Sequence, residues 1–146
     1  MSPIHSHAFK AWFGASVVVD AQGAPLVLFH GTEVVEDFTV FRAGVGGGSW
    51  FADCADTAGQ FANWGGGRVM PVYLRITNPL IAQTTNRKGP SRLAMQAKKA
   101  GHDGLILTSE NYPPGTRAYV VFNPVQIKSA IGNCGAFDPT NPSILA

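Results

Sequence analysis

The residue best placed to do chemistry is a histidine that closes an apolar stretch. His30 follows the run 25–29, and Gly31 and Thr32 come directly after it. A histidine at a strand end can point a ring nitrogen into a cleft, and glycine lets a ligand approach the bare backbone. Threonine adds a hydroxyl group. Taken alone, this segment fits a binding site and a structural histidine equally well.

Other groupings of reactive residues give weaker signals. The glycine cluster 44–48 lacks the lysine and Ser/Thr of a Walker loop and precedes a predicted strand, so a flexible loop is the better interpretation. No Gly-x-Ser-x-Gly motif indicates a hydrolase. His5 and His7 lie near the N-terminus, while Cys54 and Cys134 match no metal or redox spacing. We therefore predict that the chain has no metal site.

The elements that must position His30 follow from the apolar pattern. The pattern predicts helices at 8–13 and 91–100, and a third through Ala58, Phe61 and Ala62 that Asp53 or Asp56 could cap. Strands are predicted at 17–19, 25–29, 49–52, 69–76, 105–107 and 119–122, the first two forming a hairpin. Pro71 places the early part of strand 69–76 at a sheet edge. Because strands and helices do not alternate regularly, we predict an α+β fold rather than a doubly wound parallel sheet.

Length and composition fit one folded domain over residues 1–146. A chain of 146 residues can bury its own core, and 45% hydrophobic with 14% charged residues argues against disorder. The net charge of +2 does not indicate nucleic-acid binding by itself, although folding could still gather a basic patch. No apolar run approaches the roughly 20 residues that cross a bilayer. We expect a soluble domain, alone or as the C-terminal module of a longer polypeptide.

Three short segments carry more information together than they do separately. They are Phe-His-Gly-Thr at 29–32, Trp-Phe-Ala-Asp at 50–53 and Tyr-Val-Val-Phe-Asn-Pro-Val-Gln-Ile at 119–127. In order and spacing they resemble the motifs of diphtheria-toxin-like and poly-ADP-ribose-polymerase-like ADP-ribosyltransferases, a family with a His-Tyr-Glu triad on a split, twisted β-sheet core. Segments on both sides of these motifs resemble its bacterial and phage branch, in which the domain often ends a longer phage or toxin polypeptide.

The resemblance implies a fold and an NAD⁺ site. The fold would hold two packed, mainly antiparallel sheets with short peripheral helices. His30 would bond ribose hydroxyls, the Gly31 backbone would hold the nicotinamide amide, and Thr32 would complete this cofactor-binding segment. Trp50 and Phe61, eleven residues apart as in the family, would sandwich the nicotinamide ring by stacking. Ordinary core packing is the alternative for these two aromatics.

One position departs from the family pattern. Where the family has a catalytic glutamate directly before the third motif, this chain has Ala118. The carboxylate bonds the ribose 2′-hydroxyl and stabilises positive charge as nicotinamide leaves, and alanine can do neither. The three glutamates are Glu33, Glu36 and Glu110, of which Glu110 lies in the predicted loop 108–117 before the strand. Glu110 is the glutamate that could reach the pocket.

Strand alternation predicts the direction of residue 118. We expect its side chain to face the cleft with His30, while Tyr119 points the other way. Three explanations for Ala118 stay open. The alanine is an introduced substitution that silences a toxic enzyme, a natural change in an inactive domain that keeps NAD⁺ or partner binding, or a feature of an enzyme that recruits a carboxylate from its target.

The resemblance implies a toxin-like or effector-like NAD-dependent mono-ADP-ribosyltransferase, inactivated here by Ala118. It would pass ADP-ribose to a macromolecular target and release nicotinamide. The alternatives are a non-catalytic module that binds NAD or a partner, and a structural domain of a phage particle. Thr116 is not the Gln or Glu of arginine-modifying relatives, so arginine loses weight as acceptor, while protein, nucleic acid and free nucleotide stay open. A toxin role implies an immunity protein as partner and no membrane, in the bacterial cytoplasm or in a target cell.

Overall fold

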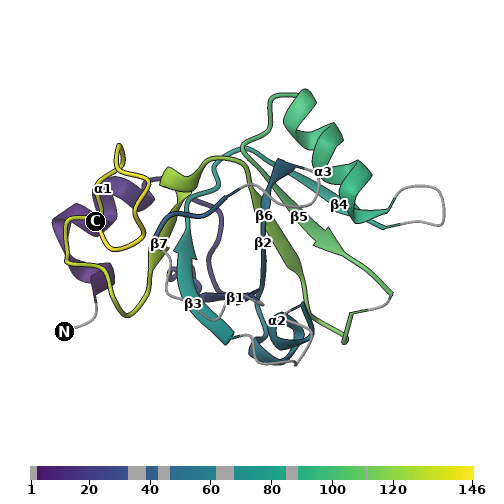
Figure 1. Ribbon diagram of the computed structural model, residues 1–146, viewed down its shortest axis with the longest axis horizontal. Coiled ribbons are helices and arrows are strands. Elements are labelled where there is room, and N and C mark those ends of the chain that lie inside the picture. The colour runs from purple at the N-terminus through teal and green to yellow at the C-terminus, as the bar shows by residue number, and fades with distance from the viewer. Residues whose placement is uncertain (1–2, 33–38, 43–46, 62–67, 85–88, 111) are drawn as a thin grey trace.

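A computed structural model describes residues 3–32, 39–42, 47–61, 68–84, 89–110 and 112–146 (Figure 1). For Thr32, 59–61 and Arg68 this description covers the backbone alone. Most of the predicted glycine loop, Glu33, Glu36 and Ala62 lie outside the described residues.

The chain forms short helices and strands in the order that the apolar pattern predicts. The helices are α1 (His7–Phe13), α2 (Ala55–Phe61) and α3 (Pro90–Lys99), with short 3₁₀ turns at Pro3–His5 and Pro124–Gln126. The strands are β1 (Leu28–Thr32), β2 (Ser49–Ala52), β3 (Arg68–Leu74), β4 (Pro79–Gln83), β5 (Gly104–Thr108), β6 (Ala118–Val121) and β7 (Ile127–Ser129). The predicted helices and the α+β class are confirmed. Strands β4 and β7 were not predicted.

The strands join into one sheet of seven, in the order β4-β5-β6-β2-β1-β3-β7. The prediction of two packed sheets is therefore wrong. Strands β1 and β2 pair edge to edge, at Phe29 opposite Ala52, so the two halves of the sheet continue each other instead of stacking face to face. The pairings among the described strands are antiparallel except that of β4 with β5, so the mainly antiparallel character is confirmed.

Two predictions about the first half of the chain can be checked against the pairing. The predicted hairpin is present in reduced form, as an isolated bridge between Val19 and Pro25 around a turn in which the Asp20 carboxylate accepts backbone N–H groups. The early part of β3 pairs with β1, while β7 begins its pairing at Val72. Pro71 thus lies where β3 has a strand partner on one side, as its missing N–H predicts.

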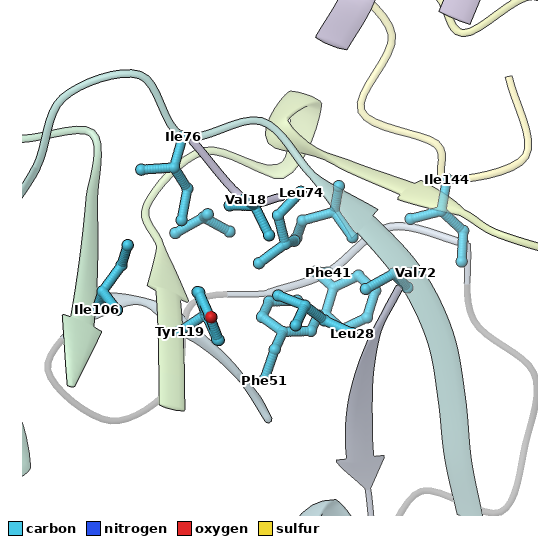
Figure 2. Packing of buried hydrophobic residues seen from close by; sticks show 12 residues of the cluster. Val18, Leu28, Phe41, Phe51, Val72, Leu74, Ile76, Ile106, Tyr119 and Ile144 are labelled. Carbon is cyan, nitrogen blue, oxygen red and sulfur yellow. The ribbon is translucent and has the colours of Figure 1, made fainter. Parts of the chain in front are cut away.

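Hydrophobic side chains cover the sheet in two main clusters. The first fills the face shown in Figure 2 and is built from Val18, Leu28, Phe41, Phe51, Val72, Leu74, Ile76, Ile106, Tyr119, Val121, Ile127 and Ile144. The second lies under α3 and is built from Leu93, Ala94, Ala97, Leu105, Leu107, Ala118 and Val120, with Trp50 packed against it. Alternate residues of β5 and β6 supply the two clusters, as the two-residue period of a strand requires.

Helix α3 connects the parallel strands β4 and β5. It begins with Pro90 in its first turn after Gly89, and it ends before Gly101, whose φ of 88° suits glycine in the left-handed region. In Figure 1, α3 lies over the β4–β5 end of the sheet, and α1 lies at the opposite end near β7. No helix in the described part of the chain is long and apolar enough to cross a bilayer.

A buried lysine holds the C-terminal segment against β7. The Lys128 side chain is fully buried, and its Nζ donates hydrogen bonds to the main-chain oxygens of Asn141 (2.9 Å), Ser143 (3.1 Å) and Ala146 (2.7 Å). Burial lowers the pKa of this amine. Three main-chain oxygen acceptors satisfy the three donors of an ammonium group, which offsets the cost of burying it.

Replacing Lys128 with methionine should destabilise the protein, because similar bulk is kept while three main-chain oxygens lose their donor. We expect the free energy of unfolding to fall by about 3 kcal/mol, as for loss of a buried hydrogen-bonded charge. Urea-induced unfolding measures the change, and Lys10→Met on the exposed face of α1 is the control. Equal midpoints for the two variants would contradict the assignment.

Candidate functional site

The candidate site lies where β1 and β2 separate. After Phe29 pairs with Ala52, β1 continues its ladder with β3 as far as Thr32, and β2 continues its ladder with β6 back to Ser49. The two strands are therefore held by neighbours on their outer sides while they diverge from each other. We call the region between them, bounded by residues 30–31 and 50–51, the seam.

The His30 ring bridges this seam. Its Nδ1 lies 2.7 Å from the backbone carbonyl oxygen of Trp50. Because a carbonyl can only accept a hydrogen bond, Nδ1 carries the proton and Nε2 carries the lone pair. The ring also packs edge-on against Phe41, with centroids 4.7 Å apart, and against Phe51 at 5.3 Å.

The surroundings of His30 keep it neutral. Burial lowers the pKa of the imidazole below its ordinary value of 6.5, and the hydrogen bond to the Trp50 carbonyl offsets part of this effect. Near neutral pH the ring therefore presents Nε2 as an acceptor. A hydroxyl group, such as that of a ribose, is the kind of ligand that donates to this atom.

The register across three strands decides which residues share a face. Phe29 lies opposite Ala52, and Ala52 lies opposite Ala118, so their side chains point to the same face. By alternation, the positions of Gly31 and Trp50 belong to this face. The site positions 31, 50 and 118 thus come from three adjacent strands on one side of the sheet.

His30 lies on the other face. Its ring contacts Phe41 and Phe51, members of the cluster that also holds Tyr119. The predicted opposition of residue 118 and Tyr119 is confirmed, but the expectation that residue 118 faces a cleft with His30 is wrong. The physical reason is the register, because one residue along β1 changes the face to which a side chain points.

Position 118 is closed off in this structure. Ala118 is 1% exposed and lies in the cluster under α3, opposite Leu107 of β5 and Ala52 of β2. Trp50 packs partly buried against the same cluster. An acidic side chain at 118 would enter an apolar environment, where burial raises the pKa of a carboxyl group.

The other predicted carboxylates have different roles. Asp53 Oδ1 accepts a hydrogen bond from the backbone N–H of Arg117 (3.0 Å), and the Asp53 N–H donates to the Arg117 carbonyl (3.3 Å). Asp53 therefore extends the β2–β6 ladder instead of capping α2, and Asp56 lies within the first turn of that helix. Glu110 is exposed in the connection from β5 to β6.

Asp53 and Arg117 also affect the pKa of the Tyr119 hydroxyl. Burial, reinforced by the Asp53 carboxylate, raises the pKa of the Tyr119 hydroxyl, while the positive charge and hydrogen bond of Arg117 act in the opposite sense. The phenol is thus protonated near neutral pH. It is not a base for the chemistry of the opposite face.

No sequence pattern pointed to Thr57, a residue of α2. Its side chain is 2% exposed, and its Oγ1 has no hydrogen-bond partner, the one such buried side-chain atom in the described part of the chain. Thr57 lies four residues before Phe61, on the same stripe of the helix. A buried hydroxyl without a hydrogen-bond partner costs stability.

The histidines and cysteines form no further site among the described residues. His5 and His7 are exposed, Cys54 and Cys134 are unpaired thiols, and no three His, Cys, Asp or Glu side chains come together as a metal site within the described ranges. Phe61 ends α2, which packs chiefly on β1, but its side chain is among those not described. The seam and the adjacent face of β2 and β6 therefore form the candidate site.

Comparison with protein families gives one match. A family described as ADP-ribosyltransferase in polyvalent proteins matches residues 20–137, which include β1, the seam, α2 and β6. The comparison with curated proteins gave no match.

The stability of the protein should depend on the protonation of His30. The unfolded chain binds a proton near pH 6.5, whereas folded His30 binds it at lower pH. Stability from this residue is therefore fully present above pH 6.5 and is lost as the pH falls through the folded pKa. We expect the melting temperature to fall between pH 7 and 5, and to fall less in His30→Gln. His7→Gln, which changes an exposed histidine, should keep the wild-type slope; equal slopes in all three proteins would refute the assignment.

Proposed function

Because the chain belongs to the family of ADP-ribosyltransferases in polyvalent proteins, we propose that it binds NAD⁺ at the seam and is a single domain over residues 1–146. The main support is the register of β1, β2 and β6, which aligns Gly31, Trp50 and position 118 on one face. The hydrogen bond of His30 to the Trp50 carbonyl supports the same site, because it fixes a neutral ring with an acceptor nitrogen.

Each binding residue has a role that its chemistry suits. His30 Nε2 accepts a hydrogen bond from a ribose hydroxyl, the Gly31 backbone holds the nicotinamide amide, and Thr32 completes this cofactor-binding segment. Trp50 and Phe61 stack on the nicotinamide ring. Trp50 lies in β2 and Phe61 ends α2, and α2 packs against both β1 and β2, so the two positions belong to neighbouring elements. Indole and phenyl rings keep the stacking surface of the family tyrosine and omit its hydroxyl.

The proposed reaction is transfer of ADP-ribose to a macromolecular acceptor. The bond between ribose C1′ and the nicotinamide nitrogen breaks, and its electron pair leaves with nicotinamide, which becomes neutral. The acceptor nucleophile forms a new bond to C1′ and loses its proton to solvent or a base. The transition state carries positive charge on the ribose, and this charge needs a nearby carboxylate.

This chain lacks that carboxylate at the expected position. Ala118 presents a methyl group, Asp53 is bonded to Arg117, and Glu110 is exposed beyond the end of β5. We therefore propose a toxin-like or effector-like transferase that Ala118 leaves inactive.

The second candidate is a module that binds NAD⁺ or a partner without catalysis. It is favoured by the burial of Ala118, which is 1% exposed within the apolar cluster under α3. The two candidates agree on binding and differ on chemistry. The next two experiments test these properties separately.

The protein should bind NAD⁺ with micromolar to millimolar affinity, and Trp50→Ala should weaken binding roughly tenfold, about 1–2 kcal/mol, by removing one stacking face. Trp50→Phe, which keeps an aromatic face, should bind within about threefold of wild type. Titration calorimetry measures both, with thermal unfolding to confirm folding. No heat from the wild type at millimolar NAD⁺ would refute the proposed function.

Ala118→Glu should restore cleavage of NAD⁺. A carboxylate at this position should accelerate nicotinamide release by roughly 100-fold to 1000-fold, by analogy with one oxyanion-hole donor. Ala118→Gln has the same bulk without the charge and should stay at the wild-type level. Nicotinamide release is followed with and without cell lysate. Bound NAD⁺ with no release by either variant would favour the binding module.

A further inference from the structure

The charges of this chain are segregated along the sequence. The segment 57–102 holds seven of the eleven Lys and Arg residues and none of the nine Asp and Glu residues. The rest of the chain holds four cations and nine anions, so the small net charge of +2 hides a strongly basic part and an acidic part. Charge asymmetry of this kind indicates an anionic partner for the basic part.

Folding places part of this charge on one side of α3. Leu93, Ala94 and Ala97 are buried, whereas Arg92, Lys98 and Lys99 are exposed. We call the exposed side, with residues 91, 92, 95, 96, 98 and 99, the basic face. It holds three cations and no carboxylate.

The spacing on the basic face suits an extended ligand. Arg92 and Lys99 are seven residues apart, so they lie on the same stripe about 10.5 Å apart along the helix axis. Met95, which is 62% exposed, and Gln96 lie between them. The stripe thus alternates charge with a soft apolar side chain and an amide group.

The basic face is connected to the proposed NAD⁺ site. The buried side of α3 packs in the same cluster as Ala118 and Val120, with Trp50 against it, so α3 covers the sheet face that carries the site. The Lys98 ammonium lies close to Gly47, three residues before Trp50, since a Cβ added to that glycine would be 3.3 Å from Nζ. A polymer lying along α3 would therefore lie beside the strands that carry the reaction.

We propose that the basic face binds a single-stranded nucleic acid and that nucleic acid is the acceptor class of this transferase. A nucleic-acid strand carries one phosphate per nucleotide whatever its sequence, so it can engage cations at both ends of the stripe while Met95 and Gln96 contact sugars or bases. Lysines clustered along a helix are typical of such surfaces, whereas the cores of protein–protein interfaces are depleted in lysine. Naming the acceptor rests on the proposed function; the docking itself does not.

The test measures binding of a fluorescein-labelled single-stranded DNA 20-mer, and of RNA of the same sequence, by fluorescence anisotropy at several salt concentrations. The variant Arg92→Gln/Lys99→Gln removes two cations of the stripe and keeps Lys98, which packs beside Gly47. The control Lys10→Gln/Arg75→Gln removes two exposed cations that lie outside α3. Thermal unfolding checks that both variants are folded.

We expect the wild type to bind both probes, with affinity that falls as salt rises. Loss of two phosphate contacts should reduce the slope of log K against log salt by about 1.4, while the control slope stays close to wild type. Three results would overturn the proposal. They are equal slopes in the two variants, no binding by the wild type at about 50 mM salt, and binding of poly-glutamate that is as tight as binding of the DNA probe. NAD⁺ titration of the same proteins separates nucleic-acid binding from the proposed transferase function. Intact DNA binding without NAD⁺ binding would contradict the transferase function alone.

Discussion

The hydrogen bond from the half-buried His30 ring to the Trp50 carbonyl links β1 and β2 at the point where the two strands separate. Where β1 and β2 separate, backbone groups lose their ladder partners, and such groups are costly when they are buried and unpaired. The imidazole supplies the donor across the seam. The same bond sets the tautomer, orients the ring and keeps Nε2 an acceptor. A residue that the family resemblance marks as catalytic is thus also a structural connection between the two halves of the sheet.

The register that follows from this connection distributes the site over two faces. His30 lies with Phe41 and Phe51, while the positions of Gly31, Trp50 and residue 118 lie on the face that α3 partly covers. The register therefore separates the imidazole from the positions that β2 and β6 contribute, and the His30–Trp50 hydrogen bond is the contact that links the two sets across the seam.

Local pattern was enough to predict the helices, most strands and the α+β class, because these depend on periodicity and on glycine or proline signals. It was not enough for what depends on distant pairing. We expected two sheets, but the pairing of β1 with β2 joins the strands into one. Asp53 accepts a hydrogen bond from Arg117, which is 64 residues away in the sequence. Lys128 lies in a short strand and would be assigned to the surface by residue type, yet hydrogen bonds to three main-chain oxygens hold it in the interior. The faces of residues 30 and 118 follow from a register across three strands that no local pattern contains.

The same register explains how one substitution can separate binding from chemistry. The residues proposed to hold NAD⁺ come from β1, β2 and α2, whereas β6 contributes residue 118 to this face near the seam. An alanine in place of a glutamate at residue 118 would lack the charge and leave the ladder of β6 with β2 and β5 in place, because a strand pairs through its backbone. Alanine also fills its place in the cluster under α3. A chain with alanine at this position keeps both the seam and the basic face, so the proposed binding of NAD⁺ and of an anionic polymer can be tested in the chain as it stands.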